Sequence, residues 1–296
     1  MRMKDVALAL LVPTFWGLGF TMAKPAIEHF PPLFTMLIAY SVTGLLILPF
    51  WREKRRTLHW HLAIITSCVV TLQGALVFFA YQELPASVTT LVVQVQVPFA
   101  VLAGRLVLGE ELSLRKIIGI TIALLGVGVV VGLPDERPPL IPVLLVMAGA
   151  VVWATGQVLA RKLAKDDGMV MLRSISLHAV PQLLIATMFF ETGQWQSLLT
   201  ATPFQWAAFF IFAFVGFFCA YSLWYTLLSR TRVDELMPFV LLMPVVGVLS
   251  AALVLDEPVT LANLAGGAMI LGGVAVVTGV GFRRHRQTSE APAPGR

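Results

Sequence analysis

The chain contains one stretch twice, and this duplication constrains the fold more than any local pattern does. Residues 92–131 match residues 239–278 at a constant offset of 147, without a gap. The aligned pairs include Glu110 with Glu257, Gly119 with Gly266, and Gly126 with Gly273. Each copy reads as a long apolar run, a short acidic turn and a glycine-rich apolar run. The pattern predicts a duplicated helical hairpin, and an internal repeat sets the architecture before any local assignment.

The composition restricts the chain to the membrane proteins. Of its 296 residues, 58% are hydrophobic and only 12% are charged, which is too little polar surface to coat a soluble domain. Cys68 and Cys219 both lie inside apolar runs, where a cysteine behaves as a small hydrophobe. We therefore expect no disulfide framework, no metal site and no cofactor.

A membrane-spanning helix needs roughly 20 apolar residues, and the chain provides ten such runs. We expect spans at residues 6–24, 33–50, 61–82, 88–108, 115–133, 140–160, 169–190, 204–228, 236–255 and 261–281. Open strands would leave backbone groups unpaired in lipid, so the runs are predicted to be helices. The first run resembles a signal peptide, but no small-residue cleavage site follows it, so it is expected to stay as the first helix.

The basic residues predict the orientation. With the N-terminus in the cytoplasm, 18 of the 21 lysines and arginines lie at cytoplasmic ends, which satisfies the positive-inside rule for both termini. We refer below to the predicted cytoplasmic side and the predicted outer side in this sense. The expected units are a five-helix repeat at 1–134, a second at 135–282 and a disordered cytoplasmic tail at 283–296.

The first helices of the two halves also match, now at an offset of 137. Trp16, Gly19, Ala23 and Lys24 align with Trp153, Gly156, Ala160 and Arg161. Because five helices per half is an odd number, the second copy enters the membrane in the opposite sense. Such an inverted-topology repeat is the architecture of secondary transporters, in which one site faces either side in turn.

Other function classes fit the sequence less well. A membrane enzyme would need a catalytic constellation, and the chain contains no H-E-x-x-H, no G-x-S-x-G and no acidic cluster in a long loop. A Walker A motif is also missing from the sequence, which argues against an ATP-driven pump. A channel would fit the composition but not the inverted repeat with prolines inside its helices.

Several segments, taken in order, resemble the EamA family of the drug/metabolite transporter superfamily. They are Lys4-Asp5 before Leu10-Leu11-Val12, Trp16 to Phe20, Pro31-Pro32-Leu33, Leu91 to Gln96, Trp224 to Arg230, and Pro244 to Gly247. The resemblance covers the chain from about Met3 to Gly281. It implies ten helices around a central cavity and export of small metabolites across the bacterial inner membrane.

The resemblance further suggests amino acids or their precursors, such as cysteine or O-acetylserine, as substrates, with cationic drugs as the alternative. The expected partners are a small-molecule substrate and the lipid bilayer, without nucleic acid. The protein is expected to be a monomer or a weak homodimer.

Aromatic residues are the first candidates for the substrate site. Trp16 lies near the middle of the first helix, too deep for the interfacial aromatic belt, and its indole N–H needs a partner there. The alternative is packing beside Gly19. Trp153 is its repeat counterpart. Tyr221, Trp224 and Tyr225 share one face of the eighth helix and could form either an interfacial belt or a substrate surface.

Buried amides are the second set of candidates. Gln94 and Gln96 are two residues apart, so their side chains are rotated by about 200° and cannot both face one cavity. Gln73 in the third helix and Gln157, one turn beyond Trp153, complete the set. Amides donate and accept hydrogen bonds at once, which suits a zwitterion, but they also join helices in membranes.

Prolines, acids and glycines give further expectations. Pro98 and Pro244 are expected inside helices four and nine, where each frees a backbone carbonyl near the cavity. Glu110 and Glu257 are expected at opposite membrane faces, each capping the helix that follows it. Gly119, Gly126, Gly266 and Gly273 are expected to let helices five and ten approach their neighbours closely.

His178 is the candidate for coupling to protons. It falls near the middle of the seventh span, and an ionisable residue inside a membrane is by default a functional candidate. Histidine changes charge near physiological pH. Proton antiport is therefore one hypothesis, and a neutral histidine bonded to a facing hydroxyl or amide is the alternative.

Overall fold

The computed structural model describes residues 3–48, 56–109, 111–132, 138–166, 168–228, 239–240 and 242–278. These residues form ten helical spans, of which eight are long and apolar enough to cross a membrane and two, Pro32–Ile47 and Met243–Val254, are shorter apolar helices. The predicted all-helical membrane fold is confirmed. The expected tail at 283–296 lies outside the described residues.

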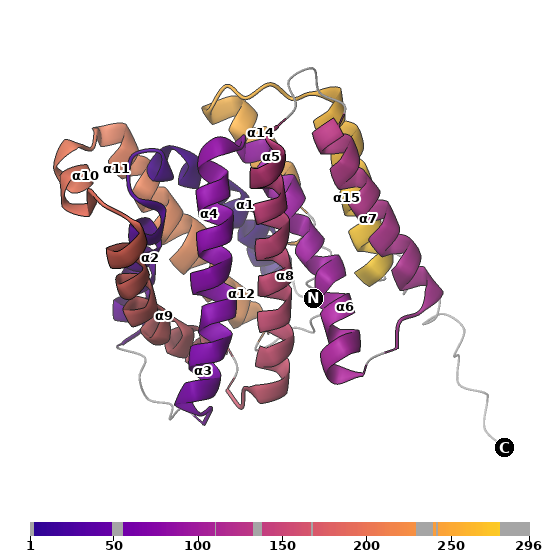
Figure 1. Ribbon diagram of the computed structural model, residues 1–296, viewed down its shortest axis with the longest axis horizontal. Coiled ribbons are helices and arrows are strands. Elements are labelled where there is room, and N and C mark those ends of the chain that lie inside the picture. Colours follow the sequence, from indigo (N-terminus) through magenta and orange to yellow (C-terminus); the bar gives the residue numbers. More distant parts are fainter. Residues whose placement is uncertain are drawn as a thin grey trace.

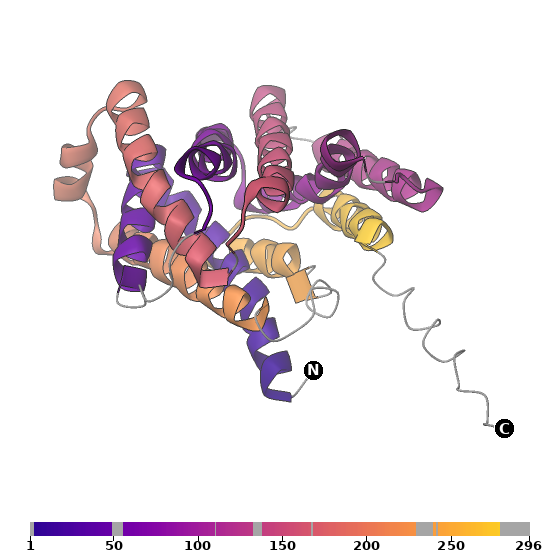
Figure 2. The same cartoon turned by 90° about the horizontal axis from the view of Figure 1, so that it is seen from below.

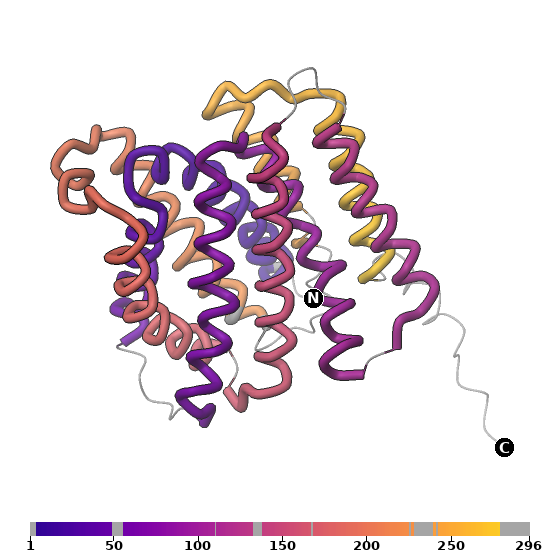
Figure 3. The backbone as a smooth tube through the Cα atoms, in the orientation of Figure 1, coloured from indigo at the N-terminus to yellow at the C-terminus, as the bar shows by residue number. Residues whose placement is uncertain are grey.

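The first half contains α1 (Met3–Ile27), α2 (Pro32–Ile47), α3 (His59–Thr66), η2 (Ser67–Leu72), α4 (Gln73–Glu83), α5 (Ala86–Val92), η3 (Val93–Val95), α6 (Gln96–Leu108) and α7 (Leu114–Gly132). The second half contains α8 (Leu140–Leu163), α9 (Gly168–Phe190), α10 (Gln194–Thr200), α11 (Pro203–Phe210), η4 (Ile211–Cys219), α12 (Ala220–Leu228), α14 (Met243–Val254) and α15 (Leu261–Thr278). Figure 3 shows α3, η2 and α4 as one continuous rod. The same continuity joins α5 to α6 and α11 to α12.

Local signals in the sequence explain several helix ends. Pro32 occupies the first turn of α2, where its missing N–H would have had no partner. At α11, Thr202 and Gln205 form a capping box. Gly109 ends α6 in the left-handed region with φ 71°, and its repeat counterpart Asp256 has φ 54°. Residues aligned at the offset of 147 therefore share an unusual backbone conformation at this position as well as similar sequence.

The two halves exchange their first helices. α1 packs against η4, α12 and α14 of the second half, and Figure 2 shows it beside the orange helix of η4 and α12. Conversely, α8 packs against η2, α4 and α6 of the first half. These contacts define two bundles, one of α3, η2, α4, α5, η3 and α6 with α8, and the other of α11, η4, α12 and α14 with α1.

Two helix pairs join equivalent elements of the two halves. The pair of α2 and α9 is one, and the pair of α7 and α15 at the right of Figure 1 is the other. A Cβ atom on Gly119 would lie 2.7 Å from the carbonyl oxygen of Gly273, and one on Gly126 would lie 2.8 Å from that of Gly266. The expected close approach of helices five and ten is confirmed, and their partners are each other.

Wide π-helical turns interrupt two equivalent spans. η2 covers residues 67–72, and η4 covers 211–219, which includes the equivalent positions at the offset of 147. Gly19 of α1 crosses η4 at Gly216, where a Cβ on Gly19 would lie 2.4 Å from the Gly216 Cα. Gly156 of α8 crosses η2 at Val69, the repeat counterpart of Gly216. The helix crossings of the two bundles are thus related by the internal symmetry.

Three features of the fold differ from the sequence expectations. α10, with seven residues between α9 and α11, was not expected, because so short a helix has no clear periodicity. Pro244 lies in the first turn of α14, where a proline needs no hydrogen bond, so its expected place inside a helix is wrong. Pro98 is the third residue of α6, inside a continuous span as expected.

Candidate functional site

The structure brings aromatic side chains from both halves together at the middle of α1. The Trp16 ring lies 5.4 Å from the ring of Tyr221 and 5.5 Å from that of Trp224, measured between centroids. Phe217 extends the cluster, 4.9 Å from Tyr221 and 4.6 Å from Tyr40 of α2. We call these five residues the aromatic cluster. The rings of Tyr221 and Trp224 point toward α1, which favours an inward-facing surface over an interfacial belt.

Two buried polar atoms on the helices that carry these rings have no partner in the described part of the chain. The indole Nε1 of Trp16 and the hydroxyl oxygen of Ser222, next to Tyr221, are buried without a hydrogen bond. A buried donor without an acceptor costs roughly 1–3 kcal/mol. A ligand that offered an acceptor to Trp16 would recover that free energy. The side chain of Tyr225 lies outside the described residues.

The other aromatic and amide candidates are distributed over the first bundle. Trp153 is half-buried and packs against the main hydrophobic core. Gln157, one turn further along α8, is exposed. Gln94 is 3% exposed, whereas Gln96 and Gln73 are half-buried. The predicted site residues therefore form no single cluster: Trp16, Tyr221 and Trp224 meet, and the remaining residues lie apart from them.

His178 has a partner that the sequence did not suggest. Its Nε2 lies 3.1 Å from Nδ1 of His59, and its Nδ1 lies 2.7 Å from the carbonyl oxygen of Ser174. A carbonyl can only accept, so Nδ1 of neutral His178 carries the hydrogen and Nε2 accepts one from His59. His178 lies at the middle of α9, as expected, and its partner His59 is the first residue of α3.

Polar contacts continue from this pair along the seam between α9 and η2. Gln182, one turn after His178, accepts hydrogen bonds from Ser67 at 3.1 Å and Thr71 at 2.7 Å, and donates one to the carbonyl of Ala63 at 3.1 Å. We call the seam formed by His59, Ser67, Thr71, His178 and Gln182 the polar track. It begins at the predicted cytoplasmic end of α3 and reaches the π-helical turn.

Carboxylates of the second half bind backbone N–H groups of the first half. Glu191 accepts from the backbone N–H groups of Leu33 and Phe34 at α2, and Asp166 accepts from those of Arg56 and Thr57 before α3. Leu33 and Phe34 lie in the first turn of α2, where N–H groups have no partner within the helix and favour a negative charge, so Glu191 caps α2. Two consecutive N–H groups bind each carboxylate, so these contacts fix the halves in register.

Glu257 is another carboxylate of the second half that binds N–H groups of the first half, and its expected role as a cap for the helix that follows it is wrong. It accepts from the N–H of Ala86 at 2.5 Å and from the N–H and hydroxyl of Ser87 at 2.9 and 2.6 Å, so it caps α5 rather than the helix that follows it. Glu110 lies outside the described residues. Among the described residues, no group of three or more His, Cys, Asp or Glu side chains is placed to hold a metal ion.

These features define a multi-pass membrane protein built from two inverted halves with exchanged first helices. The chain belongs to the EamA-like transporter family, whose model matches it twice, at residues 3–132 and 140–279. The resemblance carried by the sequence motifs is thereby confirmed.

The chain is similar over nearly its whole length to curated transporters. It is 29% identical to a "Probable amino-acid metabolite efflux pump" of Salmonella typhimurium, covering 97% of this chain and 98% of the relative. A protein of the same name from Escherichia coli is also 29% identical, with 95% and 94% covered. The "Uncharacterized transporter YvbV" of Bacillus subtilis is 26% identical, with 91% and 90% covered.

A solved structure shares the fold. A crystal structure of a protein that is 19% identical superimposes with a TM-score of 0.66, covering 97% of this chain and all of the other. At this identity the likeness concerns the fold alone.

Proposed function

We propose that the protein is a secondary exporter of small amino-acid-like metabolites in a bacterial inner membrane, with both termini in the cytoplasm. The observation that carries this proposal is the near full-length similarity to two proteins named as amino-acid metabolite efflux pumps. The exchanged, inverted halves support it, because such halves expose one site alternately to either side. Precursors such as O-acetylserine and amino acids such as cysteine are the first substrates to test.

Overexpression of the protein is expected to raise cellular tolerance to excess cysteine or a related amino acid. The purified protein in liposomes is expected to exchange labelled substrate for unlabelled substrate, with saturable kinetics. A counterflow screen over amino acids, O-acetylserine, nucleosides and cationic dyes measures this directly. Counterflow of cationic dyes alone would replace the metabolite assignment by the drug-exporter alternative, and unsaturable flux would indicate a channel.

Within this function, we assign substrate recognition to the aromatic cluster. Aromatic faces attract an ammonium group, with an energy of about 0.5–2 kcal/mol that grows as water is excluded. The free indole N–H of Trp16 supplies a donor for a carboxylate. The cluster therefore offers an aromatic face to the ammonium group of a zwitterion and a hydrogen-bond donor to its carboxylate, near the middle of α1.

We further propose that export is coupled to protons through His178 and His59. In the neutral pair the 3.1 Å between His178 Nε2 and His59 Nδ1 already holds the hydrogen that His59 donates, and Nδ1 of His178 carries the other one. An added proton therefore binds Nε2 of His59, and the hydrogen bond between the rings shares its charge with His178. The pair lies at the predicted cytoplasmic end of the polar track. Protonation there changes the charge of the surface on which α9, the partner of α2, meets the first bundle, because α9 contacts α3 and η2.

The variant His178→Gln is expected to lose accumulation driven by a pH difference while retaining substrate exchange without one. Glutamine keeps hydrogen-bonding capacity but does not titrate. The measurement is uptake into liposomes with and without an imposed pH gradient. His29→Gln is the matched control, since His29 contacts the carbonyl of Ser197 on the predicted outer side. Continued pH-driven accumulation by His178→Gln would remove this residue from the coupling mechanism.

A further inference from the structure

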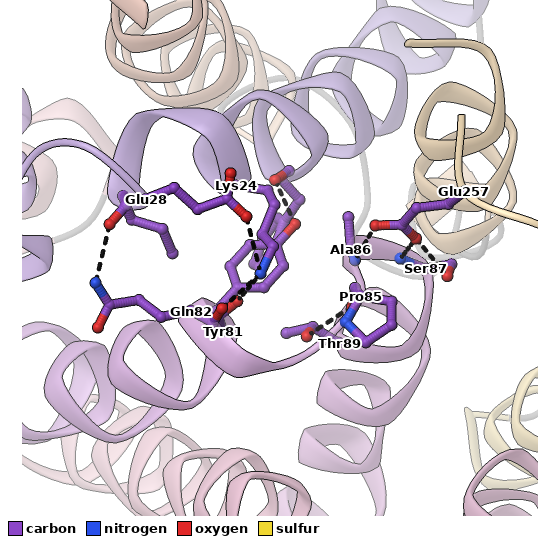
Figure 4. A network of polar contacts seen from close by, with 11 residues as sticks. Lys24, Glu28, Tyr81, Gln82, Pro85, Ala86, Ser87, Thr89 and Glu257 are labelled. Carbon is purple, nitrogen blue, oxygen red and sulfur yellow. Dashed lines mark hydrogen bonds and ion pairs between the residues drawn. The ribbon is translucent and has the colours of Figure 1, made fainter. Parts of the chain in front are cut away.

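The turn between α4 and α5 is held by opposite charges at its two ends. Nζ of Lys24 donates to the carbonyl oxygens of Tyr81 and Gln82, both at 2.8 Å, at the C-terminus of α4. Glu257 binds the N-terminus of α5 on the other side of the turn, as Figure 4 shows. A cation at a helix C-terminus and an anion at a helix N-terminus each complement the helix dipole. We call the contacts of Lys24 and Glu257 the charge clamp.

Two further hydrogen bonds connect α1 to α4 beside Lys24. The phenol of Tyr81 donates to the Phe20 carbonyl at 2.7 Å, and the amide of Gln82 donates to the Ile27 carbonyl at 3.0 Å. The Lys24 side chain is only 14% exposed and also contacts Glu28 at 3.3 Å. Its ammonium group is therefore directed into the contact with α4 rather than into solvent.

The clamp connects the two bundles rather than neighbouring parts of one. α1, which carries Lys24, packs against η4, α12 and α14, and Glu257 follows α14 directly. The turn itself belongs to the bundle of α3 to α6. Both anchors therefore lie on one bundle and the turn lies on the other, at the predicted outer side.

We propose that the charge clamp is the gate that closes the predicted outer side, and that it must open before substrate leaves. The proposal rests on the transport function proposed above. Both clamp charges bind main-chain atoms, and Glu257 also accepts from the Ser87 hydroxyl, so the acidic and basic side chains supply most of the contacts that hold the turn. Loss of either charge shifts the equilibrium toward the open arrangement by about tenfold, as expected for a hydrogen bond to a charged group.

Spin labels on Glu83→Cys and Val259→Cys test the gate without any substrate. Glu83 is exposed at the end of α4 and Val259 is exposed after Glu257, so each bundle carries one label. Cys68→Ala and Cys219→Ala remove the native thiols. In the otherwise unchanged protein a single short distance is expected. Lys24→Gln and Glu257→Gln are each expected to add a longer distance component, and Lys24→Arg is expected to retain the short one.

Glu191→Gln is the matched control. Glu191 also binds two consecutive backbone N–H groups on the predicted outer side, but at α2, away from the turn. An unchanged distance distribution in folded Lys24→Gln and Glu257→Gln protein, judged by gel filtration, would overturn the proposal, and so would an equal change in Glu191→Gln. Because the distance needs no substrate, a gate that opens in a protein that exchanges no amino acid would overturn the proposed function alone.

Discussion

Replacing Gly19 by valine is expected to lower the yield of folded protein by at least about tenfold. A Cβ atom there would lie 2.4 Å from the Cα of Gly216, and backbone atoms cannot rotate away as a side chain can. Retreat of α1 is blocked on its other side, because a Cβ on Gly17 would already lie 2.8 Å from the carbonyl oxygen of Met243. We expect a cost at or above the upper end of the usual overpacking range, about 3 kcal/mol.

The yield after detergent extraction, measured by gel filtration, tests this expectation. Gly128→Val is the matched control, since a Cβ on Gly128 meets no atom within 4 Å on the exposed face of α7. Valine at the repeat counterpart Gly156 is expected to have a smaller effect than at Gly19, because the nearest atoms there are side-chain atoms of Val69 and Cys68. Normal yield of Gly19→Val would mean that α1 does not cross η4 at this point.

The duplication made most of the fold predictable from the sequence. The repeat and the apolar runs predict ten helices in two inverted halves. Gly109 and Asp256, which are aligned at the offset of 147, both have a left-handed backbone conformation, so the alignment without a gap pairs structurally equivalent residues. The exchange of α1 and α8 between bundles was not predictable in the same way. Glycines at matched positions indicate a close contact, but they do not identify the helix on the other side.

The candidate site was less predictable, because its contacts join residues that are distant in the chain. Trp16 was a candidate from its depth, and Tyr221 and Trp224 from their spacing, yet only the packing of α1 on α12 brings them together. The partner of His178 lies 119 residues away, at the start of α3. The sequence predicts that Glu257 caps the helix that follows it, whereas the N-terminus that it binds begins at Ala86, 171 residues earlier in the chain.

The variant Trp16→Leu is expected to raise the half-saturating substrate concentration by at least about tenfold. It removes an aromatic face, with a contribution of about 0.5–2 kcal/mol to ammonium binding, and a donor whose hydrogen bond to a carboxylate contributes about 1.5–3 kcal/mol. Trp16→Phe keeps the face and loses only the N–H, so an intermediate increase is expected. Concentration-dependent counterflow in liposomes measures both variants.

Trp206→Leu separates recognition from the general cost of losing an aromatic side chain. Trp206 makes comparable ring contacts, 5.2 Å from Phe30 and 5.9 Å from Phe209, but lies on α11 outside the aromatic cluster. It is expected to reduce the amount of folded protein without changing the half-saturating concentration. If Trp16→Leu leaves that concentration unchanged, or if Trp206→Leu raises it equally, the unpartnered indole N–H does not mark the binding site. In that case the half-buried amides of Gln73 and Gln96 in the first bundle become the next candidates, because their side chains also lie within membrane spans.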